Sequence, residues 1–147
     1  MEEIIKILNE NNIRYLVIGG QALRLYGMPR FTMDWDLFIP KNDNANLDRI
    51  NEKLESHLDY PVVTLGPKGK NFVQTYQTLF GVLQFHLIPP GIPDFDEAEK
   101  LSVTLKTESG CPVKCVSAKH LLNSKLKTER AKDEDDITYL KRFLESK

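Results

Sequence analysis

The chain has 147 residues, of which 41% are hydrophobic and 28% are charged, and its formal net charge is −1 at pH 7. This length and composition predict one globular domain over residues 1–147 with a single core. A net charge near zero excludes a general attraction to nucleic acid or to anionic membranes, so any polyanion site must be local. No apolar run in the sequence approaches the ~20 residues that a membrane-spanning helix requires.

The N-terminal segment and the cysteines indicate the cellular compartment in which the protein is expected. The first residues, MEEIIKILNENN, are acidic and amphipathic, whereas a secretory signal has a basic segment followed by an apolar one. Cys111 and Cys115 stand in CPVKC, and on one strand their side chains would lie about 13 Å apart, beyond the reach of a disulfide. We therefore expect unbridged cysteines and a cytoplasmic protein.

The first part of the chain predicts alternating helices and strands. Residues 2–11 carry an apolar helical stripe, and RYLVIG (14–19) is rich in β-forming residues and ends on two glycines. A short helix is expected over 20–27, followed by a loop and the strand DWDLFI (34–39). Residues 42–58 begin with capping side chains and place leucine and isoleucine at helical spacing, which predicts a longer helix.

The middle of the chain predicts a run of strands. YPVVTLG (60–66) is expected to form one strand. Residues 71–78 and 82–88 flank the turn sequence LFG and predict a hairpin. A second hairpin is expected where residues 102–107 and 112–116 flank ESGC.

Helices dominate the rest of the prediction. We expect a short helix over 94–100, then helices over 118–128 and 133–145. The whole pattern predicts an α/β (α+β) fold with a mixed β-sheet flanked by helices. Its core would span about 13–90, and a helical C-terminal segment would span about 117–147.

Two carboxylates interrupt the apolar run DWDLFI. Strand side chains alternate, so Asp34 and Asp36 would share one face with Cα atoms about 6.6 Å apart, while Trp35 and Leu37 face the core. Two ionised carboxylates at this distance need a counter-charge unless one is protonated. Mg²⁺ or Mn²⁺ fits, because carboxylates are suitable ligands and substrate phosphates complete the coordination. An exposed strand end, or neutralisation by Arg30, is the alternative.

A glycine pair precedes the acids at a predicted strand-to-helix turn. Gly19 and Gly20 would let the backbone approach a phosphate closely, and N–H groups at a helix start attract anions. Arg30 would clamp a phosphate or shield the carboxylates, and Thr32 would fix the loop or bond an oxygen. A glycine pair alone indicates only a turn, but together with Asp34 and its partner it predicts a site for a metal–triphosphate.

The stretch YLVIGGQALRLYGMPRFTMDWDLFI resembles the signature of the nucleotidyltransferase superfamily, the fold of the catalytic core of DNA polymerase beta. That signature is a strand, a G-G or G-S turn that opens a helix, and an acidic pair hDhDh on the next strand. The form GGxAxxxxGxxRxTxDxDL is similar to minimal prokaryotic members, including relatives of toxin–antitoxin transferases. LQFHLIPPGIPDFDEAEKLSVTL resembles the family's third strand, loop and short helix. A C-terminal segment similar to that of a subgroup carries Lys125, Arg130, Lys132, Asp133 and Asp136.

The resemblance implies metal-dependent transfer of a nucleoside monophosphate from an NTP to a hydroxyl acceptor, with release of pyrophosphate. Asp34 and Asp36 would be catalytic residues and the ligands of Mg²⁺ (or Mn²⁺). The residues expected to bind the nucleotide are Gly19, Gly20, Arg30, Thr32 and Lys125. The acceptor would be an RNA, a protein or a small-molecule hydroxyl, and a toxin–antitoxin partner protein is a further expectation.

One position departs from the family pattern. A third carboxylate usually stands on a later strand, and the matching position in LQFHLIP is His86. A neutral imidazole suits Mg²⁺ poorly, whereas Mn²⁺ or Zn²⁺ accepts it. His86 is therefore expected to be catalytic as a general base, since imidazoles titrate near neutral pH, or to bind a softer metal. The alternatives are a catalytically degenerate module that binds a nucleotide or a protein, and an ordinary strand histidine with a hydrogen-bond partner.

The remaining polar residues carry weaker expectations. Asp133 and Asp136 are three residues apart and are expected to cap a helix and to pair with Arg130 or Lys132. His120 has no evident partner in the sequence and is expected at the surface or its boundary.

Overall fold

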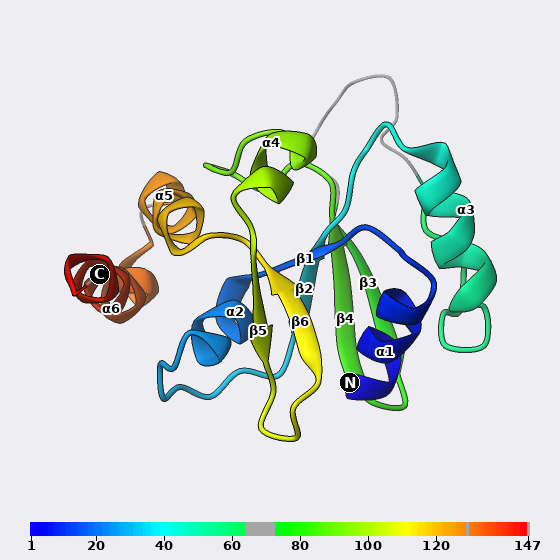
Figure 1. Ribbon diagram of the computed structural model, residues 1–147, viewed down its shortest axis with the longest axis horizontal. Helices are drawn as coiled ribbons and strands as arrows, with labels where there is room; N and C mark the ends of the chain where they lie inside the picture. Colours follow the sequence, from blue (N-terminus) through cyan, green and yellow to red (C-terminus); the bar gives the residue numbers. More distant parts are fainter. Residues whose placement is uncertain (64–72, 129, 147) are drawn as a thin grey trace.

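The computed structural model describes residues 1–63, 73–128 and 130–146. Within these ranges six strands form one mixed sheet with the order β3-β4-β2-β1-β6-β5 (Figure 1). The strands are β1 (Leu16–Ile18), β2 (Trp35–Phe38), β3 (Val73–Thr78), β4 (Gly81–His86), β5 (Val103–Lys106) and β6 (Pro112–Cys115). The helices are α1 (Glu2–Glu10), α2 (Gly19–Leu25), α3 (Asn44–Lys53), α4 (Phe95–Lys100), α5 (Ala118–Thr128), the 3-10 helix η1 (Ala131–Asp133) and α6 (Glu134–Glu145).

The pairing of β2 decides which residues meet. β2 lies between β1, to which it is antiparallel, and β4, to which it is parallel. Asp36 is opposite Ile18 on one side and Gln84 on the other, and His86 is opposite Phe38. Residues in register on neighbouring strands share a face, so Asp36, Gln84 and His86 point to the same side of the sheet. The predicted hairpins are confirmed as β3–β4 and β5–β6, and residues 71 and 72 of the first prediction lie outside the described residues.

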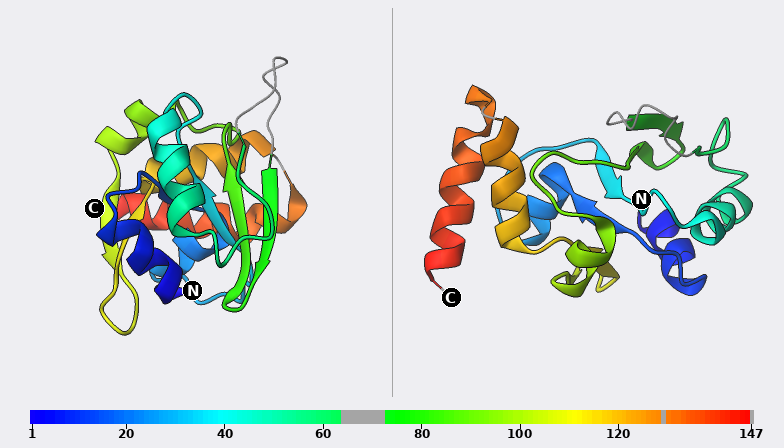
Figure 2. Two further views of the ribbon diagram at one scale, coloured as in Figure 1. Left: turned by 90° about the vertical axis from the view of Figure 1, so that its right-hand side faces the viewer. Right: turned by 90° about the horizontal axis from the view of Figure 1, so that it is seen from above.

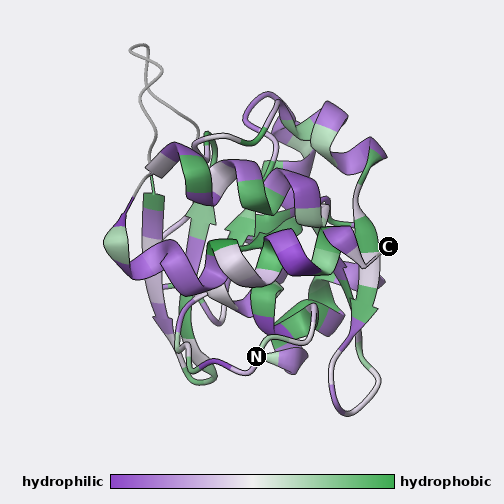
Figure 3. Cartoon of the chain, turned by 90° about the vertical axis from the view of Figure 1, so that its left-hand side faces the viewer, coloured by the Kyte–Doolittle hydropathy of each residue, from purple (hydrophilic) through white to green (hydrophobic). Residues whose placement is uncertain are grey.

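The core forms where the sequence pattern predicts it. Ile4, Ile5 and Leu8 of α1 are fully buried, which confirms the apolar stripe over the first helix. Leu37, directly after Asp36, is fully buried, and Trp35, between the two acids, is partly buried and packs against the core. Figure 3 shows the hydrophobic residues gathered on the central strands.

The strand predicted over 60–66 is wrong for the residues that can be assessed. Residues 61–63 have no strand partner, because side-chain amides satisfy their backbone groups. Asn51 accepts from the N–H of Val62 (2.7 Å) and donates to its carbonyl (2.9 Å). Gln74 does the same for Val63, at 2.8 and 3.0 Å. Residues 64–66 of this prediction lie outside the described residues.

The helix predicted over 42–58 forms but is shorter. Asp43 caps α3, since its carboxylate accepts a hydrogen bond from the N–H of Asn46 at 2.9 Å. The helix ends at Lys53, and the chain turns where the carbonyl of Leu54 accepts from the N–H groups of His57 and Leu58. This turn brings the following segment back beside α3.

The C-terminal helices lie side by side on one flank of the sheet. Figures 1 and 2 show α5 and α6 packed together there, with α1 and α3 on the opposite flank. Ser117 caps α5 by accepting from the N–H of His120 at 3.1 Å. Among the described helices, none has the length and apolarity needed to cross a membrane.

The expectation for His120 is wrong. Its side chain is buried, with 8% of the residue exposed, because it lies beside the buried face of α5 that includes Ala118 and Leu121. Its Nδ1 atom has no hydrogen-bond partner. Burial lowers the pKa of His120 below the ordinary value, although nearby Glu97 opposes this shift.

Candidate active site

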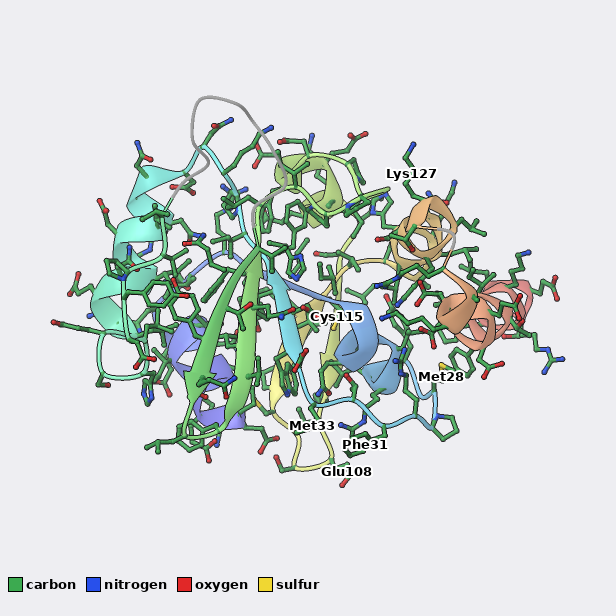
Figure 4. The ribbon with its side chains drawn as sticks, turned by 180° about the vertical axis from the view of Figure 1, so that it is seen from behind. Met28, Phe31, Met33, Glu108, Cys115 and Lys127 are labelled. Carbon is green, nitrogen blue, oxygen red and sulfur yellow. The ribbon has the colours of Figure 1, made fainter. Side chains whose placement is uncertain are left out.

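The connection between α2 and β2 delivers polar side chains into one cavity. Arg30, Thr32 and Asp34 line a cavity of about 730 Å³. Phe31 and Met33 alternate with them, are 83% and 68% exposed, and lie at the periphery of the molecule in Figure 4. This alternation is that of an extended segment. It explains how a segment outside the sheet places every second side chain in the same site.

The two acids of the pair lie on different types of structure. β2 begins at Trp35, one residue later than predicted, so Asp34 belongs to the preceding connection and Asp36 to the strand. Both side chains nevertheless line the cavity. The alternation expected of a strand therefore extends beyond the hydrogen-bonded ladder.

The glycine pair seats these side chains against the backbone. Gly19 has φ +70°, and a Cβ there would lie 2.6 Å from Oδ2 of Asp36. A Cβ on Gly20 would lie 2.8 Å from Oγ1 of Thr32. Both separations are shorter than a carbon–oxygen contact allows, so a side chain at either position would displace its neighbour. Both glycines line the cavity.

His86 lies beside the second acid. Its Nε2 atom is 2.8 Å from Oδ1 of Asp36, and the two side chains are 16% and 19% exposed. The parallel pairing of β2 and β4 creates this contact, because it places His86 two residues beyond the partner of Asp36 on the same face. The position where the family resemblance implies a third carboxylate therefore adjoins the acid pair.

A second part of the cavity wall is basic and comes largely from the C-terminal helices. Nζ of Lys125 is 3.2 Å from carboxylate oxygens of both Asp133 and Asp136. Nη1 of Arg30 is 2.5 Å from Oδ2 of Asp136, and Nε of Arg130 is 2.9 Å from Oδ2 of Asp133. Burial raises the pKa of Asp133, but Arg130 and Lys125 outweigh this and lower it below the usual value.

The ion pairs correct part of the prediction for the two C-terminal acids. Asp133 pairs with Arg130 as expected, but its carboxylate makes no capping bond at the start of α6 because the cations occupy it. Asp136 pairs with Arg30 and Lys125 instead. Since Arg30 is held by Asp136, the hypothesis that it neutralises the Asp34–Asp36 pair is not supported.

Asp34 and Asp36, which line the same cavity, are the residues that would hold a Mg²⁺ ion. This cation commonly binds through one or two carboxylates and completes its coordination with water and substrate phosphates. In the described part of the chain, no three His, Cys, Asp or Glu side chains are grouped so as to hold a metal ion. An ion on the acid pair would therefore depend on phosphate oxygens and water for its remaining ligands.

The rim of the cavity contains residues that the sequence did not single out as site residues. Pro89 and Pro90 follow β4, and Leu121 and Thr128 come from α5. The sequence PPG follows the strand that carries His86. A rigid loop at the end of a strand with a candidate site residue is the sequence feature that could have indicated the two prolines.

Comparison with known proteins identifies the fold of the chain. No protein-family model and no curated protein sequence matches the chain. A solved structure of TM1012 from Thermotoga maritima, a candidate nucleotidyltransferase, superposes with a TM-score of 0.68 over 99% of this chain and 90% of its own, at 14% identity. The chain has the nucleotidyltransferase fold. This confirms the predicted mixed sheet flanked by helices.

Two further structures similar to this chain are those of an antibiotic adenylyltransferase and of an antibiotic-resistance factor. The lincosamide antibiotic adenylyltransferase LnuA, solved with lincomycin bound, has a TM-score of 0.58 and 16% identity over 96% of this chain and 94% of its own. The antibiotic-resistance factor ANT(2'')-Ia has a TM-score of 0.54 and 19% identity over 98% of this chain and 80% of its own. At these identities the similarity establishes the fold.

Proposed function

We propose that the protein transfers a nucleoside monophosphate from an NTP to a hydroxyl acceptor and releases pyrophosphate. The observation that carries this proposal is that Asp34 and Asp36 share one cavity with the Gly19–Gly20 turn. A carboxylate pair beside a glycine turn that lines the same cavity suits a metal–triphosphate, and the nucleotidyltransferase fold supports the same chemistry.

Different residues of the chain would position the metal ion and the phosphates of the nucleotide. Asp34 and Asp36 would hold Mg²⁺ (or Mn²⁺), which when bound neutralises charge on the phosphates. Gly19 and Gly20 line the cavity, where their backbone N–H groups would bind phosphate oxygens, and their missing side chains make room for Asp36 and Thr32. Arg30 and the other cations of the wall stabilise the charge that shifts to the leaving pyrophosphate, as in other phosphoryl transfers.

His86 is proposed to accept the proton of the acceptor hydroxyl. An ionised carboxylate only accepts hydrogen bonds, so the 2.8 Å contact between Nε2 of His86 and Oδ1 of Asp36 supports the tautomer with the ring proton on Nε2. The other ring nitrogen, Nδ1, is then the basic one. Proton transfer from the acceptor oxygen to Nδ1 would accompany attack of that oxygen on the α-phosphorus, while the bond to pyrophosphate breaks.

The acceptor class rests on comparison alone. LnuA and ANT(2'')-Ia, which were solved with lincomycin and with adenylyl-2''-tobramycin, support a small-molecule hydroxyl acceptor. An RNA or protein acceptor, and a toxin–antitoxin partner protein, are further proposals that follow from the sequence resemblance.

Labelled nucleotides test the proposed reaction. The protein is incubated with each of the four NTPs, labelled at the α-phosphate or at the γ-phosphate, with Mg²⁺ or Mn²⁺ and a panel of the three acceptor classes. We expect α-label in an acceptor product and γ-label in pyrophosphate. Asp34→Asn should abolish both, and transfer that persists in this variant would refute the proposal.

A catalytically degenerate nucleotide-binding or protein-interaction module is the second candidate. The observation that favours it is that His86, and not a carboxylate, adjoins Asp36. Calorimetry with metal and NTP separates the two candidates, because this one predicts binding of the metal–nucleotide with no labelled product.

A further inference from the structure

The basic wall of the cavity carries unequal numbers of charges. Three cations, Arg30, Lys125 and Arg130, share two carboxylates, Asp133 and Asp136, in one connected set of ion pairs. This set therefore has one positive charge in excess. All three cations line the cavity, so the excess charge is available to an anion bound there.

One carboxylate oxygen holds two of these cations together. Oδ2 of Asp136 is 2.5 Å from Nη1 of Arg30 and 3.2 Å from Nζ of Lys125. The Asp136 side chain is only 5% exposed, whereas both cations face the cavity. Two positive groups that contact the same oxygen lie close enough to repel each other. The negative charge of the Asp136 carboxylate between them offsets this repulsion. Asp136 thus fixes the spacing of the two groups.

We propose that Asp136 is a positioning residue that aims Arg30 and Lys125 at the β- and γ-phosphates of the bound nucleotide. This rests on the proposed function, since it assigns the end of the triphosphate farther from the acid pair to the basic wall. The Arg30 guanidinium has five N–H donors in a planar fork, so the bond to Asp136 leaves others for phosphate oxygens.

The same contact links distant parts of the chain. Arg30 and Asp136 are separated by 106 residues and join α6 to the connection that also carries Thr32 and Asp34. A shift of α6 would therefore move Arg30 and disturb the segment that holds the first acid. The C-terminal helices are part of the site and do more than pack against it.

Inorganic tripolyphosphate is the probe, because it has the phosphates of the nucleotide without its base, sugar or reactive ester. Titration calorimetry at fixed ionic strength should show binding to the full chain. Arg30→Gln should weaken the affinity about 10-fold or more, as expected for loss of charge-assisted hydrogen bonds. Absence of binding to the unmodified protein would overturn the proposal.

Asp136→Asn separates positioning from charge. Removing a carboxylate makes the cavity more positive, so charge alone predicts tighter binding of tripolyphosphate. Positioning predicts the opposite, a weakening comparable to that of R30Q. The double variant R30Q/D136N should lose less affinity than the sum of the two single effects predicts, because Asp136 acts partly through Arg30. Unchanged or tighter binding by D136N would overturn the proposal.

Two further variants complete the design. Asp96→Asn removes an acid 2.5 Å from Arg14, an ion pair of the same length but more exposed and at a different site, and should leave tripolyphosphate affinity unchanged. Asp136→Glu keeps the charge and shifts it by one methylene, and it carries the test should D136N fail to fold. Weaker binding by D136E is expected, and wild-type binding would refute the positioning role.

The two proposals fail in different ways. Tripolyphosphate binding requires no transfer, so a protein that binds it as described but transfers no nucleotide would refute the proposed reaction alone. If D136N transferred nucleotide with the wild-type kcat and KM, the positioning role alone would be refuted.

Discussion

Oδ2 of Asp36 occupies the space that the missing side chain of Gly19 leaves open, 2.6 Å from where a Cβ would stand. The second acid of the pair is thus seated on the backbone at the start of α2. The glycine is required twice at this position, by its φ of +70° and by the carboxylate beside it. This contact joins the two sequence features that first indicated a site.

Gly19→Ala should abolish nucleotidyl transfer, because the new methyl group displaces the Asp36 carboxylate. Gly110→Ala is the matched control, since Gly110 has φ +89° and no atom within 4 Å of an added Cβ. Both variants should lose about 1–2 kcal/mol of unfolding free energy in urea from the left-handed backbone conformation. Equal transfer activity in the two variants would show that Asp36 tolerates the methyl group.

His86→Ala should lower kcat for transfer about 10²- to 10⁴-fold, the usual contribution of a general base. The KM for the NTP should stay within a factor of about two, because His86 acts on the acceptor and not on the nucleotide. Steady-state kinetics with NTP varied at saturating acceptor measures both. A rise in KM with kcat preserved would place His86 at the nucleotide instead.

Lys125→Met should destabilise the fold by about 3 kcal/mol, since it leaves two buried carboxylates with one of their cations removed. Lys127→Met, on the same helix but exposed and at the surface in Figure 4, should change stability by less than about 0.5 kcal/mol. Urea unfolding at pH 7 compares them. Similar midpoints would mean that the ion network contributes little to stability.

His120 should make stability depend on pH. Burial holds its pKa below the ordinary 6.5 in the folded state, so the unfolded chain binds the proton more readily. The free energy of unfolding should therefore fall as the pH falls below about 6.5, the ordinary histidine pKa, and level off below the folded-state value. Urea unfolding between pH 8 and pH 5 measures this slope, which should be smaller in His120→Gln. An identical slope in that variant would assign it to other groups.

Local patterns predicted the positions of the acid pair and of the glycine turn in the structure. Alternation along residues 30–36 requires only the geometry of an extended chain, and the need for glycine at Gly19 arises within one turn. The hairpins formed as expected for the same reason, since each depends on residues close in sequence.

Long-range pairing escaped prediction. The contact between Arg30 and Asp136 spans 106 residues, and nothing in the spacing of the C-terminal charges indicates that Asp136 reaches Arg30. Val62 looked like a strand residue, but the distant amide of Asn51 takes the place of a strand partner. In both cases the interacting side chain belongs to a different element, and only the fold brings it close to its partner.

Relaxation of water protons by Mn²⁺–nucleotide complexes examines the acid pair without an acceptor. Binding to a slowly tumbling protein enhances the relaxation, so each of the four Mn²⁺–NTP complexes is titrated with wild-type protein and with variants. We expect enhancement with the wild type and with Asp96→Asn, and its loss in Asp34→Asn and Asp36→Asn. Full enhancement in both Asp34→Asn and Asp36→Asn would mean that these acids do not hold the metal–nucleotide.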